Sequence, residues 1–328
     1  MKKFFSAVMV CLFVLISVFP TYAYSTGAKT DLDGWALSVK RFAAKCNGTD
    51  DNTLAESILS EMGMSETHIA QLPESKKLEI ANAVSIQKVT EYAKVTEDAI
   101  EVPLTEQEYL EVAQEMDAAQ LSGIQPYAQG DNWPFSGEDS LFKKDLYIYE
   151  TKNAPKGTYG IFVSYSWKNF TARYRGEDVI SISGEHLIFD RDSFGISMNY
   201  VYTQTTSLGT TGHTQSQYID MNNLKNPNDL WQESNGISYT FNLPNNIYTV
   251  QSSLIYINAD FLMMVSCGID NPNNVTPFNV YGNYFHNYLG VALGLSVSIN
   301  GASVSVSCLT AAYSRYQIQT AHKITYTP

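Results

Sequence analysis

The sequence is short of positive charge. Its 328 residues include 21 Lys and Arg against 33 Asp and Glu, which gives a formal net charge of −12, and no stretch is rich in basic residues. Because Lys and Arg supply most of the affinity for phosphate groups, this composition argues against nucleic acid as a partner. The acidic excess is concentrated in residues 24–121, which carry 18 acidic and 8 basic side chains.

Long apolar runs are also lacking, apart from one at the start of the chain. Residues 1–23 read MKKFFSAVMVCLFVLISVFPTYA, with two lysines, an apolar core and a small-residue cleavage site. This order is typical of a secretory signal peptide. The alternative, an uncleaved anchor helix, normally requires a longer apolar run. We therefore expect a secreted, extracellular protein.

Cysteine is scarce, with four residues in the chain, one of them in the signal region. Cys267 and Cys308 fall on the apolar sides of predicted strands. An exported protein can form disulfides, so we predict a Cys267–Cys308 disulfide, with two buried free cysteines as the alternative. Cys46 is then left as an unpaired thiol.

Short catalytic motifs are missing: there is no Gly-x-Ser-x-Gly elbow, no His-Glu-x-x-His and no phosphate-binding loop. The nearest approach to a catalytic cluster is GEHLIFDRDS, which contains His186, Asp190 and Asp192. A histidine beside carboxylates can act as a general base, and aspartate oxygens suit calcium. The three residues are candidates for a hydrolase or calcium site, against the simpler interpretation of a strand entering a polar turn. No other cofactor or metal is indicated.

The chain divides into two regions of different pattern. Apolar residues at helical spacing predict a small acidic all-α segment over residues 24–121, which we interpret as a propeptide or a spacer. Its first helix is expected from Asp31 to Lys45. Further helices are expected to begin near Asp51, Ser65 and Pro73, and after a capping box formed by Thr105 and Glu108. Residues 122–140 contain two prolines and three glycines, which predicts a linker.

Residues 141–328 are rich in β-forming residues and punctuated by turn sequences, which predicts an antiparallel all-β domain. A sandwich is favoured over a barrel. The fold class is therefore α+β by domain. The predicted strands are 146–150, 160–167, 179–182, 186–189, 196–205, 237–243, 247–259, 261–267, 278–284, 316–326 and the two arms of the hairpin considered next.

That hairpin reads LSVSINGASVSVSC from Leu295 to Cys308. Asn-Gly favours a two-residue type I′ turn, which pairs Ile299 with Ala302 and gives one apolar and one serine face. Uncharged arms of this length also match membrane β-strands. The hairpin is therefore interpreted either as half-buried in a soluble sheet or as a pore-forming element that inserts residues 289–312 after removal of the helical segment.

The chain contains 22 tyrosines, and aromatic side chains with polar tips are frequent in binding surfaces. We predict a ligand-binding surface formed by Tyr147, Tyr149, Tyr165, Trp167, Tyr200 and Tyr202. The predicted function is a secreted, non-catalytic binding protein that recognises an extracellular glycan or protein. The alternatives are a pore-forming protein, the one interpretation that involves membrane contact, and a hydrolase centred on His186 and Asp190.

Overall fold

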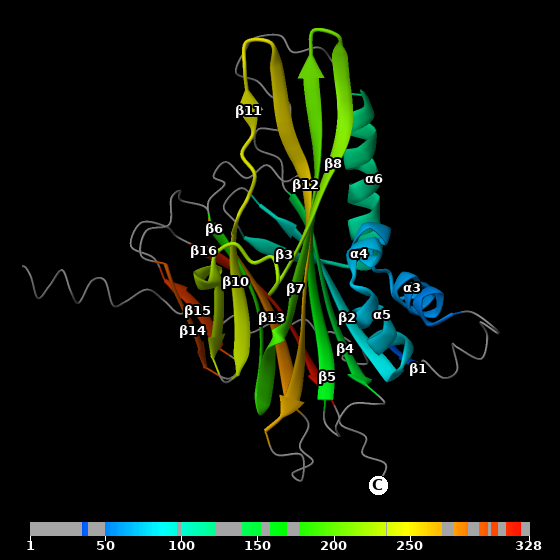
Figure 1. Ribbon diagram of the computed structural model, residues 1–328. Helices are drawn as coiled ribbons and strands as arrows, with labels where there is room; N and C mark the ends of the chain where they lie inside the picture. Colours follow the sequence, from blue (N-terminus) through cyan, green and yellow to red (C-terminus); the bar gives the residue numbers. More distant parts are fainter. Residues whose placement is uncertain are drawn as a thin grey trace, which may run out of the picture. The chain divides into compact units, whose positions relative to one another are not determined.

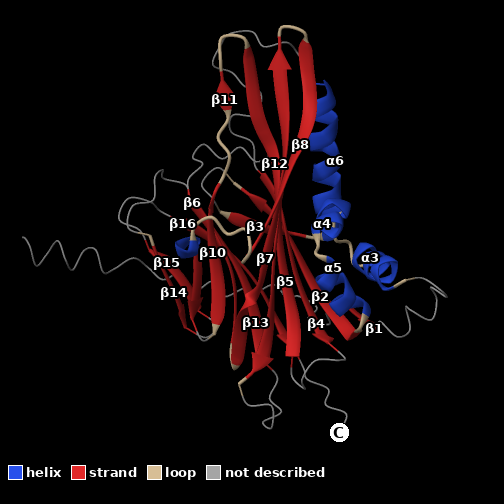
Figure 2. Ribbon diagram, in the orientation of Figure 1, coloured by secondary structure: helices blue, strands red, loops and turns tan. Residues whose placement is uncertain are grey.

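The computed structural model describes residues 35–38, 50–96, 100–122, 140–151, 158–168, 177–233, 235–270, 278–287, 295–300, 303–307 and 313–322. Within them the chain is organised around antiparallel β-sheets (Figures 1 and 2). None of the helices in these ranges is long and apolar enough to cross a membrane.

The larger sheet contains nine of the described strands, and its main path runs β1-β2-β4-β5-β12-β7-β8. Two further strands, β3 and β11, pair with β2 and β12 respectively. The strands are β1 (Trp35–Ser38), β2 (Ala83–Val95), β3 (Glu101–Leu104), β4 (Ser140–Thr151), β5 (Thr158–Lys168), β7 (Leu187–Thr206), β8 (Gly209–Asp220), β11 (Ile247–Tyr248) and β12 (Ser252–Ile269).

A second sheet of five described strands has the order β16-β13-β6-β10-β9, and a separate two-stranded sheet is formed by β14 and β15. These strands are β6 (Glu177–Gly184), β9 (Leu230–Glu233), β10 (Gly236–Asn242), β13 (Phe278–Asn287), β14 (Ser296–Asn300), β15 (Ser303–Ser307) and β16 (Tyr313–His322), with a short 3-10 helix η1 (Pro227–Asp229) before β9.

Four α-helices precede β4 in the described chain: α3 (Asp51–Glu61), α4 (Glu66–Gln71), α5 (Glu74–Ala81) and α6 (Glu106–Ser122). Their predicted start signals are confirmed. Ser65 Oγ accepts from the backbone N–H of His68. At α6, Thr105 N donates to Glu108 Oε2 at 2.7 Å and Glu108 N donates to Thr105 Oγ1 at 3.3 Å, which is the reciprocal bonding of a capping box.

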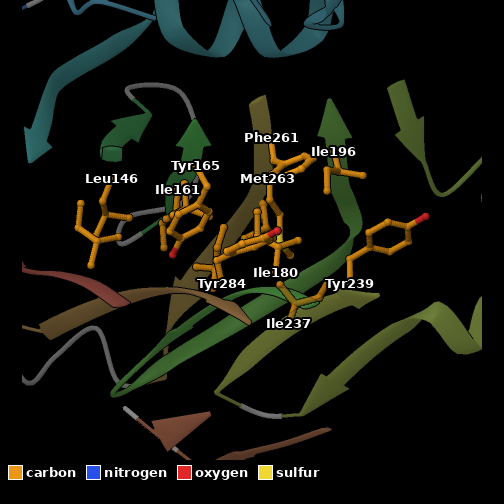
Figure 3. Packing of buried hydrophobic residues seen from close by; sticks show 14 of the residues in the cluster. Leu146, Ile161, Tyr165, Ile180, Ile196, Ile237, Tyr239, Phe261, Met263 and Tyr284 are labelled. Atoms are coloured by element: carbon orange, nitrogen blue, oxygen red, sulfur yellow. The ribbon is translucent and has the colours of Figure 1, made fainter. Parts of the chain in front are cut away.

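The larger sheet is buried on both faces, so its central strands are apolar at consecutive positions. Alternate residues of β5 show the division. Ile161 and Val163 pack with the second sheet, whereas Phe162 packs with the cluster that includes α3, α4 and α5. Figure 3 shows the first of these cores, where side chains from both sheets, including Phe261 and Tyr284, meet.

The predicted fold class is confirmed: a small helical segment precedes antiparallel sheets that form a sandwich. The predicted helical region also contains strands, however. Residues 83–95 form β2, which pairs with β1 on one side and β4 on the other, and residues 35–38 form β1 where a helix was expected. Removing residues 24–121 would withdraw β2 from the sheet, so this pairing weighs against cleavage of the segment after folding.

The predicted register of the hairpin is wrong. Ile299 pairs with Val304 and Asn300 with Ser303, so Ile299 does not oppose Ala302. The connection is therefore made by residues 301 and 302, which lie outside the described residues. A shift of two residues leaves every side chain on its original face. For this reason the apolar pattern cannot distinguish the two registers, and only the turn decides between them.

Candidate functional site

Five of the six aromatic residues predicted to bind ligand are buried, with at most 5 % of each side chain exposed. They are Tyr147, Tyr149, Tyr165, Trp167 and Tyr200. The prediction of an exposed binding surface is wrong for these five, because their rings fill the two cores of the protein. The sixth, Tyr202, is half-buried, and its ring stacks on His213 at a centroid distance of 5.2 Å.

His186, Asp190 and Asp192 lie at and just after the turn between β6 and β7, and all three are exposed. Asp190 Oδ1 accepts from the backbone N–H of Asp192 at 3.1 Å, which stabilises a local bend. Across the described residues, no hydrogen bond or ion pair joins His186 to either carboxylate, and no cluster of three or more His, Cys, Asp or Glu suits a metal ion. The hydrolase and calcium hypotheses stay predictions.

Cys267 is a free, fully buried thiol on β12, and burial raises its pKa far above the ordinary value. The predicted disulfide to Cys308 is therefore not formed in this structure; Cys308 itself, like Cys46, lies outside the described residues. The thiol packs in the core between the two sheets. The described part of the β14–β15 hairpin instead covers the opposite face of the second sheet, which separates it from Cys267.

The β14–β15 hairpin is half-buried, as in the soluble interpretation. Val297, Ile299 and Val304 are buried and pack with Val179 of β6 and Phe285 of β13. Membrane insertion of residues 289–312 would break this packing, and it stays a prediction without a specific observation in its favour.

A buried polar network joins α4 to the larger sheet. No local sequence pattern indicates this network, because His68 and Asp260 are far apart along the chain. His68, with 1 % of its side chain exposed, directs Nε2 toward Asp260 Oδ2 of β12 at 2.9 Å. Its Nδ1 lies 3.0 Å from Asn199 Nδ2 and 2.7 Å from Ser197 Oγ. Both of these residues belong to β7.

The network continues through a second residue of α4. Gln71 of α4 donates from Nε2 to Asn199 Oδ1 at 3.1 Å, and its carbonyl oxygen accepts from Ser197 Oγ. Ser197, His68 and Asp260 thus contain the groups of a nucleophile, base and carboxylate, but Ser197 and His68 are inaccessible to a substrate. The arrangement fastens α4 to the sheet.

Asp260 keeps its charge in this setting. Burial acts to raise the pKa of its carboxyl group, but the neighbouring His68 and hydrogen bonds from Ser166 and Ser65 outweigh it and hold the pKa below the ordinary value. The bond from Ser166 Oγ is 2.7 Å long.

A second buried His–Asp pair lies in the smaller sheet. Asp178 is inaccessible and accepts from the hydroxyl of Tyr284, from Nδ1 of His286 at 3.1 Å and from the backbone N–H of Asn287 at 3.0 Å. Three donors compensate the buried carboxylate, which is what a structural rather than a reactive carboxylate requires.

One end of the larger sheet is formed by the β7–β8 and β11–β12 hairpins, and we call it the hairpin end (Figure 1). Its two turns lie side by side, because Thr206 at the end of β7 pairs with Ser252 at the start of β12. Leu208 in the first turn is 98 % exposed and Val250 in the second is fully exposed. These are the most exposed large apolar side chains among the described residues.

The hairpin end carries no fixed charge. In the sequence, residues 193–219 and 235–259 contain no Asp, Glu, Lys or Arg, although 16% of the chain is charged. Thr, Ser, Gln, Asn and Tyr take their place. His213 is on β8, where Thr211 Oγ1 lies 2.9 Å from its Nε2. The two uncharged tracts are visible in the sequence, but only the pairing of β7 with β12 brings them together.

Comparisons with known proteins give similar solved structures but no family. No family model matches it, and no curated protein matches it significantly. A collagen-binding subdomain of the Enterococcus faecalis surface protein ACE is 11% identical, with 52% of this chain and 91% of that chain covered and a TM-score of 0.23. A collagen-binding domain of a Staphylococcus aureus adhesin is 10% identical, with 52% and 92% covered and a TM-score of 0.24. Clostridium perfringens delta-toxin is 8% identical, with 74% and 94% covered and a TM-score of 0.22. TM-scores this low assign neither a family nor a function.

Proposed function

We propose that this protein is a secreted, non-catalytic binding protein that attaches to an uncharged extracellular surface through the hairpin end. The exposed Leu208 and Val250, side by side on a part of the sheet without charged residues, carry this proposal. Secretion follows from the predicted signal peptide.

A binding role is favoured over catalysis by the state of the titratable groups. The two histidines that contact carboxylates, His68 and His286, have at most 8 % of their surface exposed. In each network, hydrogen-bond donors satisfy the carboxylate that the histidine contacts. The exposed His186 has no such partner within the described chain.

The proposal also explains why the hairpin end tolerates exposed apolar side chains. An isolated exposed aliphatic residue is unremarkable in a soluble protein. Leu208 and Val250, however, lie at adjacent turns in a region without charged residues. A partner can cover this surface without removing an ion from water. Ile247 and Tyr248 of β11, 53 % and 60 % exposed, extend the same surface.

The test is binding of the fluorescently labelled mature chain to intact eukaryotic and bacterial cells, to immobilised neutral glycans and to extracellular matrix proteins. The test variant is the double substitution Leu208→Asn with Val250→Asn. The control is Ile188→Asn with Leu110→Asn, which removes two aliphatic side chains that are 52 % and 47 % exposed elsewhere. We expect saturable binding that the test variant loses and the control keeps. Equal binding by both variants would refute the role of the hairpin end.

A further inference from the structure

We propose that the partner of the hairpin end is the surface of a neutral phospholipid bilayer, into which Leu208 and Val250 insert as two adjacent apolar tips; this inference rests on the proposed function and names its partner. It differs from pore formation by the 289–312 hairpin, because it uses other residues and requires no strand to leave the fold.

The two tips lie at the same level. Thr206 and Ser252 form the last pair between β7 and β12. Leu208 is two residues beyond Thr206, and Val250 is two residues before Ser252. Because neighbouring strands are about 4.8 Å apart, a single planar surface can receive both side chains at once. The sheet holds them in place, so little conformational freedom is lost on binding.

Four backbone N–H groups of the two turns are already hydrogen-bonded, which lowers the cost of placing the turns in a lipid environment. Thr206 Oγ1 accepts from the N–H of Leu208 at 3.2 Å. In the other turn, Thr249 Oγ1 accepts from the N–H groups of Gln251 at 3.3 Å and Ser252 at 2.9 Å, and Thr249 N donates to Ser252 O at 2.8 Å. The same device, a threonine at the start of the turn, supports the apolar tip in each hairpin.

The polar residues next to Leu208 and Val250 suit the headgroup layer of a bilayer. Threonine, serine and glutamine side chains offer hydrogen bonds to phosphate and ester oxygens, and the exposed Tyr248 is of a type enriched at membrane interfaces. There is no lysine or arginine in the two uncharged tracts to attract anionic lipid, and the net charge of −12 opposes it. The charge pattern therefore selects a zwitterionic bilayer.

The shape of the hairpin end distinguishes a bilayer from a protein partner. A stable protein interface buries about 800 Å² on each side with close complementarity. Two fully exposed side chains at the ends of narrow turns do not form such a patch by themselves. A fluid bilayer, in contrast, can accommodate single projecting side chains without a matching pocket.

The test is co-sedimentation of the mature chain with large unilamellar vesicles of pure phosphatidylcholine and with vesicles containing phosphatidylserine. We expect binding to phosphatidylcholine, weaker binding when phosphatidylserine is added, and a loss of at least about tenfold in the partition coefficient for Leu208→Asn with Val250→Asn. The Ile188→Asn, Leu110→Asn control should bind as the wild type does. In addition, a Leu208→Trp variant should shift its emission to shorter wavelength on adding phosphatidylcholine vesicles, relative to an Ile188→Trp variant.

The inference is overturned if the wild type does not bind phosphatidylcholine vesicles, or if the double substitution leaves that binding unchanged. Cell or matrix binding that depends on Leu208 and Val250, without vesicle binding, would identify a protein or glycan partner and leave the proposed function intact. Absence of tip-dependent binding to all of these surfaces would refute both.

Discussion

His68 Nε2 lies 2.9 Å from Asp260 Oδ2, and this contact fastens the helical segment to the centre of the larger sheet. The two residues come from α4 and β12, which are separated by most of the chain. Because Gln71 of the same helix bonds Ser197 and Asn199 of β7, α4 is attached to two neighbouring strands. The helices are therefore part of the folded unit rather than an appendage to it.

This contact predicts a specific response to acid. The folded-state pKa of Asp260 is below the ordinary carboxyl value. Its ionised form therefore adds stability above about pH 4, and this contribution disappears as the pH falls through the lowered pKa. We expect Asp260→Asn to lower the Tm at pH 6 to 7 and to flatten the decline of Tm between about pH 4 and pH 2, as measured by circular dichroism.

The matched control is Asp192→Asn, which removes an exposed carboxylate outside the network. It should leave both the Tm at neutral pH and its acid dependence close to those of the wild type. If Asp260→Asn and Asp192→Asn have the same Tm profile, the His68–Asp260 contact does not contribute to stability.

We predict that a side chain at Gly160 would clash with a neighbouring ring in the larger sheet. Gly160 pairs with Tyr149, and a Cβ atom at Gly160 would lie 2.0 Å from Cζ of that ring. The ring cannot easily move, because its hydroxyl donates to Glu79 Oε2 at 2.8 Å and it is enclosed by the helices. We expect Gly160→Ala to lower the free energy of unfolding by about 1–3 kcal/mol in urea denaturation.

Gly268→Ala provides the comparison, since a Cβ atom there would meet nothing within 4 Å. It should change the unfolding free energy by less than about 0.5 kcal/mol. Equal destabilisation by the two substitutions would mean that glycine flexibility, not the Tyr149 ring, determines the effect.

The sequence predicts best those elements whose boundaries are determined by neighbouring residues in the chain. The helix starts at Ser65 and Thr105 depend on side chains within three residues, and both were correct. Strand β2 was missed for a physical reason: Ile86 and Val89 are spaced as in a helix, and Lys88 suggests an exposed position. In the fold, Lys88 Nζ is neutralised by Asp145 Oδ1 at 3.1 Å on the neighbouring strand, a contact that no local pattern reveals.

The candidate site was not predictable in the same way. Tyrosine is suited to both cores and binding surfaces, so composition alone could not show that Tyr165 and its neighbours are buried. Leu208 was visible as an apolar residue in a polar stretch, but its importance depends on Val250 reaching the same level through the pairing of β7 with β12. Such relationships arise from strand order, which the sequence pattern left open.

We predict that the thiol of Cys267 is protected from chemical modification in the folded protein. It is completely buried, and burial raises its pKa, so little reactive thiolate forms near neutral pH. In a Cys46→Ser, Cys308→Ser variant of the mature chain, which lacks Cys11, we expect no reaction with a thiol-specific chromogenic reagent under native conditions. After unfolding in guanidinium we expect one equivalent of reaction. Peptide mapping of the unreduced wild type should show no Cys267–Cys308 cross-link; finding that cross-linked peptide would contradict the structure at this position.

Substitutions in the β14–β15 hairpin test whether this hairpin unfolds together with the rest of the protein. Ile299 is buried in the cluster with Val179 and Phe285, and its Cγ2 lies 2.8 Å from where a Cβ atom of Gly236 would be. Ile299→Ala removes three carbon atoms from this contact and should destabilise the protein by about 2–5 kcal/mol. Ser298→Ala, on the exposed face of the same strand, should change stability by less than about 0.5 kcal/mol. If Ile299→Ala instead leaves the global Tm unchanged while protease cleaves the hairpin, then β14 and β15 open independently, which is the behaviour that insertion of residues 289–312 into a membrane would require.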